Sequence, residues 1–460
     1  MIADLKPYPE YKESGLPWLG QVPAHWEVRP AFGAFVPNHE RNHGMKEKTV
    51  LSLSYGRIVI KPAEKLHGLV PESFETYQIV NPGDIVLRTT DLQNDHTSLR
   101  VGMVRDRGII TSAYLALRVK AGFSPEFGFQ FLNVWDTSKA IYGYGSGLRQ
   151  NLDFSHFKRM PVTVPPPEEQ AAIARFLDWA TGRLEQAIRL KRREIALLNE
   201  QKQAIIHRAV TRGLDPDAPL KDSGIPWLGD IPAHWEVRPG LVGLAEKQVK
   251  NKKMAETTVL SLSYGRIIVK PKEKLRGLVP ESFETYQIVE PGDIIIRPTD
   301  LQNDHTSLRV GSVKDRGIIT SAYLCLLVRP GLTPEYAFHL LATFDFMKVL
   351  YCLGSGMRQN LSFNDFKRLP ILIPPIEEQT GISASITAKL EPVLVAISRL
   401  EREIDLLREY RTRLVADVVT GKLDVREAAA TLPDEDPLGA FAASRDPDPD
   451  LETPDDEEDP

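Results

Sequence analysis

The sequence predicts a mixed α/β (α+β) protein made of two homologous domains, each followed by a long helix. Three observations support this prediction: a tandem repeat with a constant offset of 209 residues, β-rich segments in the first part of each copy, and an uninterrupted helical pattern in the second part. At 460 residues, with 42% hydrophobic and 26% charged residues, the chain has the composition of a globular protein of two or three domains.

The repeat runs through almost the whole chain without gaps. The motif "HWEVRP" at His25 returns at His234, and "EEQ" at Glu168 returns at Glu377. Between positions 49 and 115, 57 of the 67 residues are identical to those 209 positions later. A period this long exceeds the unit of a solenoid, so we expect each copy to be a whole domain plus its connector.

The first part of each copy reads as short strands. In the first copy, runs such as "TVLSLSYG" and "YQIVNPGDIVLR" are rich in β-branched residues, and "NPGD" predicts a turn before a strand. Near its end, "FSHFKRM" predicts a short helix. These patterns predict a domain made mainly of strands with few helices.

The second part of each copy reads as one long amphipathic helix. From Glu168 to Val210 there is no proline and one glycine, and apolar residues recur at a seven-residue spacing, as in Leu177 and Leu184. The second copy has a matching stripe, interrupted by Pro392, which we expect to kink the helix or delay its start. We expect the two helices to pack on each other; the alternative, each helix packing on its own domain, explains their equal length less well.

These patterns divide the chain into five segments. We expect a first domain at 1–163, a long helix at 164–213, a second domain at 214–372, a second long helix at 373–430 and an acidic tail at 431–460. The tail has a formal charge of −11, which leaves the rest of the chain at +6. Its prolines and carboxylates predict a disordered, solvated segment, and the basic body permits nucleic-acid binding.

Known catalytic and targeting motifs are missing from the sequence. It contains no P-loop, no glycine-rich dinucleotide fingerprint, no H-E-x-x-H, no G-x-S-x-G and no methyltransferase motif for a flipped base. Glu168 and Glu169 fit the favourable first turn of a helix better than a catalytic pair. Cys325 and Cys352 are expected to be small buried side chains. Without an apolar span or signal peptide, a cytoplasmic protein without a membrane partner is expected.

The repeat also predicts a symmetry. Two homologous domains joined by antiparallel helices would be related by a pseudo-two-fold axis, as in a homodimer fused into one chain. Duplex DNA presents inverted half-sites at fixed spacings, so it matches such an arrangement of two equal binding surfaces.

Several motifs resemble one protein family. "YKESGLPWLGQVPAHWEV" near the start, its echo "LKDSGIPWLGDIPAHWEV", and "GSGLRQNLDFSHFKRMPVTVPPPEEQAAIARFLD" are similar to the specificity subunit of type I restriction-modification systems. The resemblance covers roughly residues 8 to 425 and includes the order domain, helix, domain, helix. It implies that each domain is a target-recognition domain for a short half-site and that the paired helices set the gap between half-sites.

The resemblance also implies the partners and the chemistry. The expected partners are double-stranded DNA, two DNA methyltransferase (modification) subunits and restriction/translocase subunits. The complex would methylate adenine or cleave DNA, with S-adenosylmethionine, ATP and Mg bound by the partner subunits and no cofactor bound by this chain. Because the two copies are nearly identical, the hypothesis is a bipartite, near-palindromic target.

The base-reading residues are sought in the repeated stretch "TDLQNDHTSLRVG". Asn and Gln can pair with adenine and Arg with guanine, each contact giving about 1–3 kcal/mol of discrimination. The candidates of this stretch are Gln93, Asn94, His96, Ser98, Arg100, Gln302, Asn303, His305, Ser307 and Arg309. The alternative is a loop that uses these polar residues for turn chemistry.

Two further pairs of arginines are candidates for DNA contact. Arg57 and Arg266, in "SYGRI", would contact a groove or a phosphate, or lie solvated at a strand end. Arg149 and Arg358 follow "GSG", whose open backbone N–H groups suit a phosphate; the alternative is a turn before the short helix. Two other functions remain open: a stand-alone DNA-binding regulator and a coiled-coil scaffold that binds protein.

Overall fold

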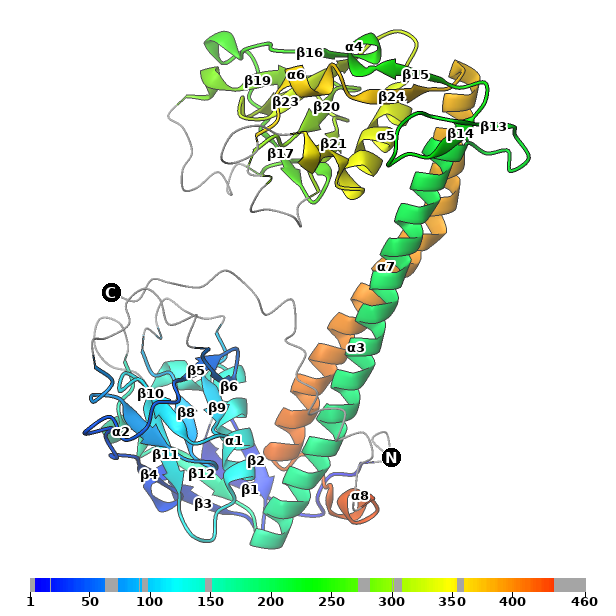
Figure 1. The fold of residues 1–460 in the computed structure, drawn as a ribbon. Helices are drawn as coiled ribbons and strands as arrows, with labels where there is room; N and C mark the ends of the chain where they lie inside the picture. Colours follow the sequence, from blue (N-terminus) through cyan, green and yellow to red (C-terminus); the bar gives the residue numbers. More distant parts are fainter. Residues whose placement is uncertain are drawn as a thin grey trace. The chain divides into compact units, whose positions relative to one another are not determined.

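The computed structural model describes residues 5–16, 18–62, 73–90, 92, 98–144, 151–271, 282–299, 301, 308–353 and 360–433. The chain forms two compact units: unit 1 comprises residues 1–191 and 402–460, and unit 2 comprises residues 192–401. Each unit therefore holds one domain of the repeat and a part of each long helix (Figure 1).

The described residues of unit 1 form eleven short strands before α1 and a twelfth after α2. The strands are β1 (Tyr11–Leu16), β2 (Gly20–Pro23), β3 (Glu27–Pro30), β4 (Phe35–Pro37), β5 (Leu51–Ser54), β6 (Arg57–Ile60), β7 (Gln78–Val80), β8 (Ile85–Leu87), β9 (Val101–Met103), β10 (Gly108–Ile110), β11 (Leu115–Val119) and β12 (Pro161–Val164). The helices of this domain are η2 (Ala31–Gly33), α1 (Pro125–Thr137), η4 (Ala140–Gly143) and α2 (Phe154–Phe157).

A four-stranded antiparallel sheet with the order β4-β11-β8-β9 forms the centre of this domain. Side chains of β8 alternate between its faces, as the period of a strand requires. Ile85 and Leu87 join the main core with Phe127 and Phe131 of α1. Val86 joins a smaller cluster on the other face, with residues of β5, β7, β10 and β11. Both faces of the sheet are therefore covered, which explains its continuous apolar sequence.

Unit 2 repeats this plan. Its strands are β13 (Leu220–Asp222), β14 (Asp230–Pro232), β15 (Glu236–Pro239), β16 (Leu244–Glu246), β17 (Leu260–Ser263), β18 (Arg266–Val269), β19 (Gln287–Val289), β20 (Ile294–Ile296), β21 (Val310–Ser312), β22 (Gly317–Ile319), β23 (Leu324–Val328) and β24 (Pro370–Ile373). Its smaller helices are α4 (Gly240–Gly243), η5 (Lys252–Met254), η7 (Phe283–Thr285), α5 (Pro334–Phe346), η8 (Val349–Cys352) and α6 (Phe363–Phe366). The central sheet has the equivalent order β16-β23-β20-β21.

Helices α1 and α5 are elements that the sequence interpretation missed. Each begins with a clear local signal: the Ser124 side chain accepts a hydrogen bond from the Phe127 N–H, and Thr333 does the same for Tyr336, with proline at the first helical position. The predicted turn before β8 and the short helix in "FSHFKRM" are both confirmed. The mixed α/β fold class is confirmed as well.

The two long helices are α3 (Pro167–Arg212) and α7 (Ile376–Val419), and the short α8 (Arg426–Ala430) follows α7. Glu168 and Glu169 lie in the first turn of α3, as predicted. Pro392 lies inside α7 and does not delay its start, because the helix begins sixteen residues earlier. The predicted second helix at 373–430 is thus one long helix and one short one.

Within unit 1, the first part of α3 and the last part of α7 pack into one core. Ile173, Leu177 and Ala180 of α3 lie in the same cluster as Leu414 and Val418 of α7. Each helix segment therefore buries its apolar stripe against the other segment and against the domain.

Polar contacts give the relative direction of these two segments. Lys191 Nζ lies 2.5 Å from Glu403 Oε2, and Arg411 Nη1 lies 3.1 Å from Glu185 Oε1. As the residue number falls along α3 it rises along α7, so the segments run antiparallel. In unit 2, Ile206 and Val210 of α3 likewise share a core with Ile382 and Ile386 of α7.

Helix α7 is long and apolar enough to cross a membrane by length and composition alone, with a window of mean hydropathy 1.2. This is weak support for a membrane segment, because an amphipathic helix packed in a protein core meets the same criterion. Its apolar stripe includes Ile382 and Ile386, which are buried in the core of unit 2.

One prediction about the cysteines is wrong. Cys325 is buried in β23, but Cys352 is exposed at the end of η8. The cause is local: Val349 and Leu350 of this short helix face the core, which turns Cys352 to the surface. Trp26 and Trp235 are fully buried.

Candidate nucleic-acid interface

The first predicted recognition loop lies between β8 and β9 of unit 1, with its equivalent between β20 and β21 of unit 2. The structure describes where these loops leave and re-enter the domain. Seven of the predicted base-reading residues lie outside the described residues: Gln93, Asn94, His96, Gln302, Asn303, His305 and Ser307. Their roles stay predictions.

Arg100 holds the two ends of the loop in unit 1 together. Its guanidinium donates to the carbonyl oxygens of Arg88 (3.3 Å) and Thr90 (2.8 Å), which lie where the loop begins. Its Nε donates to the Tyr142 hydroxyl at 3.3 Å, and its backbone N–H donates to Asp136 Oδ2 at 2.7 Å. A single buried residue thus joins the loop ends and η4 through its side chain and α1 through its backbone N–H.

Arg309 repeats every one of these contacts in unit 2. The guanidinium donates to the carbonyl oxygens of Arg297 (3.3 Å) and Thr299 (2.6 Å), and Nε donates to the Tyr351 hydroxyl at 3.1 Å. The backbone N–H of Arg309 donates to Asp345 Oδ2 at 2.7 Å. The two units therefore present this loop from the same support.

Burial corrects the prediction for Arg100 and Arg309. Both side chains are 0% exposed. A guanidinium that left these carbonyl oxygens to reach a base would leave buried polar groups without partners, which costs about 1–3 kcal/mol each. We therefore assign both arginines a positioning role in place of base contact. Ser98 lies beside Arg100 and is half-buried, and its predicted DNA contact stays a prediction.

The second candidate loop starts from the same support. The segment 145–150, which contains Arg149, follows η4, where Tyr142 accepts the bond from Arg100. Just after that segment, the Leu152 N–H donates to the carbonyl oxygen of Thr89 at 2.9 Å. The roots of both candidate loops are thus tied together. Unit 2 has the matching bond from Leu361 to Pro298 at 2.8 Å.

Arg149 and Arg358 themselves lie outside the described residues. Positive charge at the root of their loops is nevertheless visible. The exposed Lys139 lies over the Tyr142 ring, 5.3 Å from its centroid, and Lys348 lies 4.5 Å from the centroid of the Tyr351 ring. Such cations suit a surface that receives a phosphate backbone.

Asp136, Tyr142 and their equivalents are site residues that the sequence interpretation missed. A signal for them exists in the repeat. "VWDTSKAIYGYGSG" and "TFDFMKVLYCLGSG" differ at most positions but keep the Asp, the Lys, the Tyr and the final "GSG". Two of the residues that stay fixed where their neighbours diverge, Asp136 and Tyr142, are the partners of Arg100 in the arginine network.

The predicted arginines of the "SYGRI" motif lie on two-stranded hairpins. Arg57 starts β6, and its side chain is 58% exposed, with Nη2 3.3 Å from Glu185 Oε1 of α3. Arg266 starts β18 in unit 2 and is also exposed. Both are accessible to a ligand, so their predicted DNA contact remains a prediction that geometry permits.

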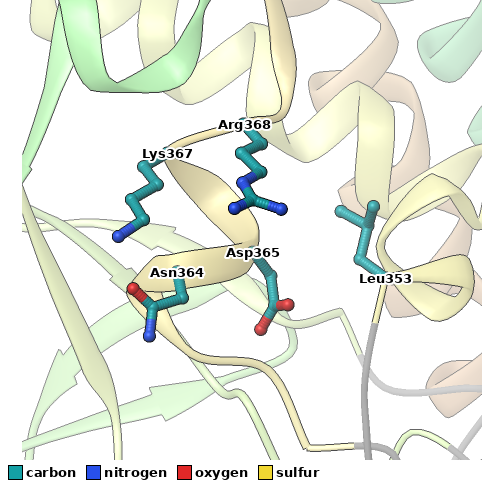
Figure 2. A pocket seen from close by; sticks show the side chains of 5 residues that line it. All are labelled: Leu353, Asn364, Asp365, Lys367 and Arg368. Atoms are coloured by element: carbon teal, nitrogen blue, oxygen red, sulfur yellow. The ribbon is translucent and has the colours of Figure 1, made fainter.

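A pocket of about 520 Å³ lies in unit 2 beside the root of the second candidate loop. Figure 2 shows its lining: Leu353, Asn364, Asp365, Lys367 and Arg368. Asp365 accepts hydrogen bonds from the backbone N–H and the hydroxyl of Ser362 at the start of α6, both at 2.8 Å.

The two cations of this pocket are the side chains of Lys367 and Arg368 (Figure 2). Lys367 and Arg368 follow α6, and Arg368 is exposed. A pair of cations in one pocket suits a phosphate oxygen. The described residues contain no group of three or more His, Cys, Asp or Glu side chains that could hold a metal ion.

Comparisons with known proteins place these features in a family context. No protein-family model matches the chain. The MjaVIII type I restriction enzyme specificity subunit of Methanocaldococcus jannaschii is 24% identical over 376 residues, which covers 76% of this chain and 81% of the relative. The MjaX specificity subunit of the same organism, a provisionally named type I subunit, is 21% identical over 431 residues, covering 89% and 96%.

A solved structure shows a similar fold. A chain from a study of complex assembly and conformational transition in a type I restriction-modification system matches with a TM-score of 0.59 and 14% identity, covering 86% of this chain and 98% of the other. The curated relatives are specificity subunits of type I restriction enzymes, which confirms the resemblance found in the sequence motifs.

Proposed function

We propose that this chain, a homologue of type I restriction enzyme specificity subunits, is the DNA-recognition subunit of a type I restriction-modification complex. One observation carries the proposal furthest: the same buried arginine network supports the same polar loop in both units. A loop that has nearly the same sequence in both units and is held at a rigid base fits a surface that binds the same ligand twice.

The target follows from the repeat. Two nearly identical recognition units acting in opposite directions would read a half-site, an unspecified spacer and nearly the inverse complement of that half-site. The antiparallel helix segments within unit 1 support an inverted arrangement, with the long helices acting as the spacer that sets the gap.

Catalysis is assigned to the partners. We expect two DNA methyltransferase subunits to methylate adenine within the target and restriction/translocase subunits to cleave DNA. S-adenosylmethionine, ATP and Mg would be bound by those subunits, in a cytoplasmic complex. This chain would contribute target selection and position the methyltransferases on the DNA.

Methylome sequencing of the native host, with and without this gene, tests the proposal. The expected result is a methylated adenine motif that is lost with the gene and consists of two near-inverse half-sites. A gene deletion that leaves every methylated motif in place would contradict the function. Two unrelated half-sites would contradict the near-palindromic target and leave the DNA-recognition role intact.

A further inference from the structure

The hairpins that carry the "SYGRI" motif have nearly the same sequence in both units but different surroundings. At their tips, Tyr55 of unit 1 is 39% exposed, whereas Tyr264 of unit 2 is 89% exposed. The turns themselves are alike, since both tyrosines have positive φ angles, 45° and 47°. The difference must come from what each hairpin packs against.

In unit 1 a carboxylate holds the hairpin to the long helices. Glu185 Oε1 lies 3.3 Å from Arg57 Nη2 of the hairpin and 3.1 Å from Arg411 Nη1 of α7. Two cations therefore share one counter-ion, and the positive charge of Arg57 is compensated within the protein.

In unit 2 this carboxylate is missing. At the repeat offset of 209, Glu185 corresponds to Leu394, Arg57 to Arg266 and Arg411 to Lys202. The two cations are thus retained while the counter-ion between them is replaced by a leucine. Among the residues that the structure describes, Arg266 has no carboxylate partner.

The charges of Lys202 and Arg266 affect each other. The pKa of Lys202 is lowered, first by its partial burial and then by the positive charge of Arg266. Two neighbouring cations without a counter-ion repel each other, and an anion bound between them would relieve this repulsion. The exposure of Arg266 and Tyr264 leaves the approach to this place open.

We propose that Arg266 and Lys202 form a phosphate-binding site for the DNA backbone on unit 2, and that Glu185 blocks the equivalent site on unit 1. The inference rests on the proposed DNA-binding function and deepens it, because it makes two nearly identical recognition units unequal in affinity. Unit 2 contributes a backbone contact that unit 1 lacks.

The test measures the salt dependence of DNA binding by the full chain. Fluorescence anisotropy with a labelled duplex of random sequence is sufficient, because a phosphate contact is independent of base sequence. The slope of log affinity against log salt is negative, and its magnitude decreases by about 0.9 for each lost phosphate contact. A decrease of this size changes the affinity by about three- to fourfold over a fourfold change in salt concentration. Arg266→Ala should show this loss, and Arg57→Ala should leave the slope unchanged.

Reciprocal exchanges of the helix residue provide the decisive pair of variants. Glu185→Leu should free Arg57 and increase the magnitude of the slope by about 0.9. Leu394→Glu should compensate the positive charge of Arg266 and decrease the magnitude of the slope by about the same amount. Glu194→Leu is the matched control, since Glu194 is exposed on the same helix and forms no ion pair with the residues that the structure describes. It makes the same change in net charge away from the hairpin.

Each outcome has a distinct meaning. Equal slopes for Arg57→Ala and Arg266→Ala would overturn the inference, as would a Glu185→Leu effect no larger than that of Glu194→Leu. In either case a steep wild-type slope would still support DNA binding. A flat wild-type slope would contradict the proposed function itself and favour a protein ligand.

Discussion

The first turns of the two long helices carry the same glutamate, but this glutamate has different hydrogen-bond partners in the two units. In unit 1, Glu169 is 4% exposed and accepts hydrogen bonds from the Tyr8 hydroxyl (2.5 Å) and the Trp26 indole N–H (2.8 Å), with His25 Nε2 at 2.8 Å. In unit 2, Glu378 is 25% exposed and keeps only the histidine contact among the hydrogen bonds to described residues, at 2.8 Å.

The difference is caused by a segment outside the repeated motif. Tyr8 is held by α8, where the Arg426 guanidinium lies 5.1 Å from its ring centroid, and burial raises the pKa of Tyr8 so that its hydroxyl stays a donor. At the matching place unit 2 has the exposed Asp217, and the Trp235 indole nitrogen has no hydrogen-bond partner among the described residues. Equal motifs therefore give unequal networks when their surroundings differ.

The largest predicted effect follows from this contrast. Glu169→Ala should lower the free energy of unfolding by about 3 kcal/mol, because it leaves buried donors without an acceptor, whereas Glu378→Ala should cost about 1 kcal/mol. Urea denaturation of the two variants measures both values. Hydrogen exchange read by mass spectrometry assigns each loss to its unit.

A matched pair of tryptophan variants controls for packing. Trp26→Phe removes a hydrogen-bonded indole and Trp235→Phe removes an unbonded one, so the first should cost more by about 1 kcal/mol. Similar costs in the two units would show that the Glu169 network adds no stability.

A predicted effect of intermediate size concerns the loss of stability at acidic pH. His339 of α5 occupies the position of Gln130 in α1, and burial lowers its pKa to about 4, with a small opposing effect of Glu335. The folded pKa lies below the usual value, so the unfolded chain binds the proton more readily. Stability from this group is complete above about pH 6.5 and decreases as the pH falls towards 4, with a loss of about 2 kcal/mol at about pH 5.

Urea midpoints of the wild type and His339→Gln at about pH 7 and about pH 5 check this prediction. The substitution should remove part of the acid sensitivity of unit 2. The reciprocal change, Gln130→His, should introduce acid sensitivity into unit 1. An unchanged pH dependence in His339→Gln would show that this histidine is not buried in its neutral form.

The smallest effect leaves stability unchanged and concerns reactivity. Both cysteines lie in unit 2, and burial raises the pKa of Cys325 to about 12, while Cys352 is exposed. The thiolate is the reactive form, so iodoacetamide should modify Cys352 in the native protein and Cys325 only when unit 2 opens. Peptide mass spectrometry distinguishes the two sites. Equal native rates would contradict the burial of Cys325.

Much of the architecture was predictable because it rests on local and periodic signals. The repeat offset, the long helices and the turn before β8 follow from patterns that the chain repeats. Helix α1 was missed although Ser124 and Pro125 mark its start, because its apolar side chains were interpreted as part of the strand-rich region. The same reasoning failed for Cys352, where the direction of a short helix decided exposure.

The candidate site was less predictable. Polar loop residues were recognised by type, but Arg100 and Arg309 were assigned to bases because an arginine beside Asn and Gln suggests recognition. Whether a guanidinium points to solvent or inward depends on acceptors far along the chain, such as the Tyr142 hydroxyl, and the backbone N–H of Arg100 is held by the equally distant Asp136. These partners are thirty-six and forty-two residues away, beyond any local pattern.

The sequence alone determined that the protein consists of two copies of one mixed α/β domain with long helices, since repetition and periodicity are written in the order of residues. Only the tertiary structure decided that the two copies are not equivalent. Glu169 and Glu378, or Arg57 and Arg266, differ because hydrogen bonds and ion pairs depend on which distant segment supplies the partner. The free energy of folding depends on these contacts in space, and a sequence motif specifies only one of the two residues that make each contact.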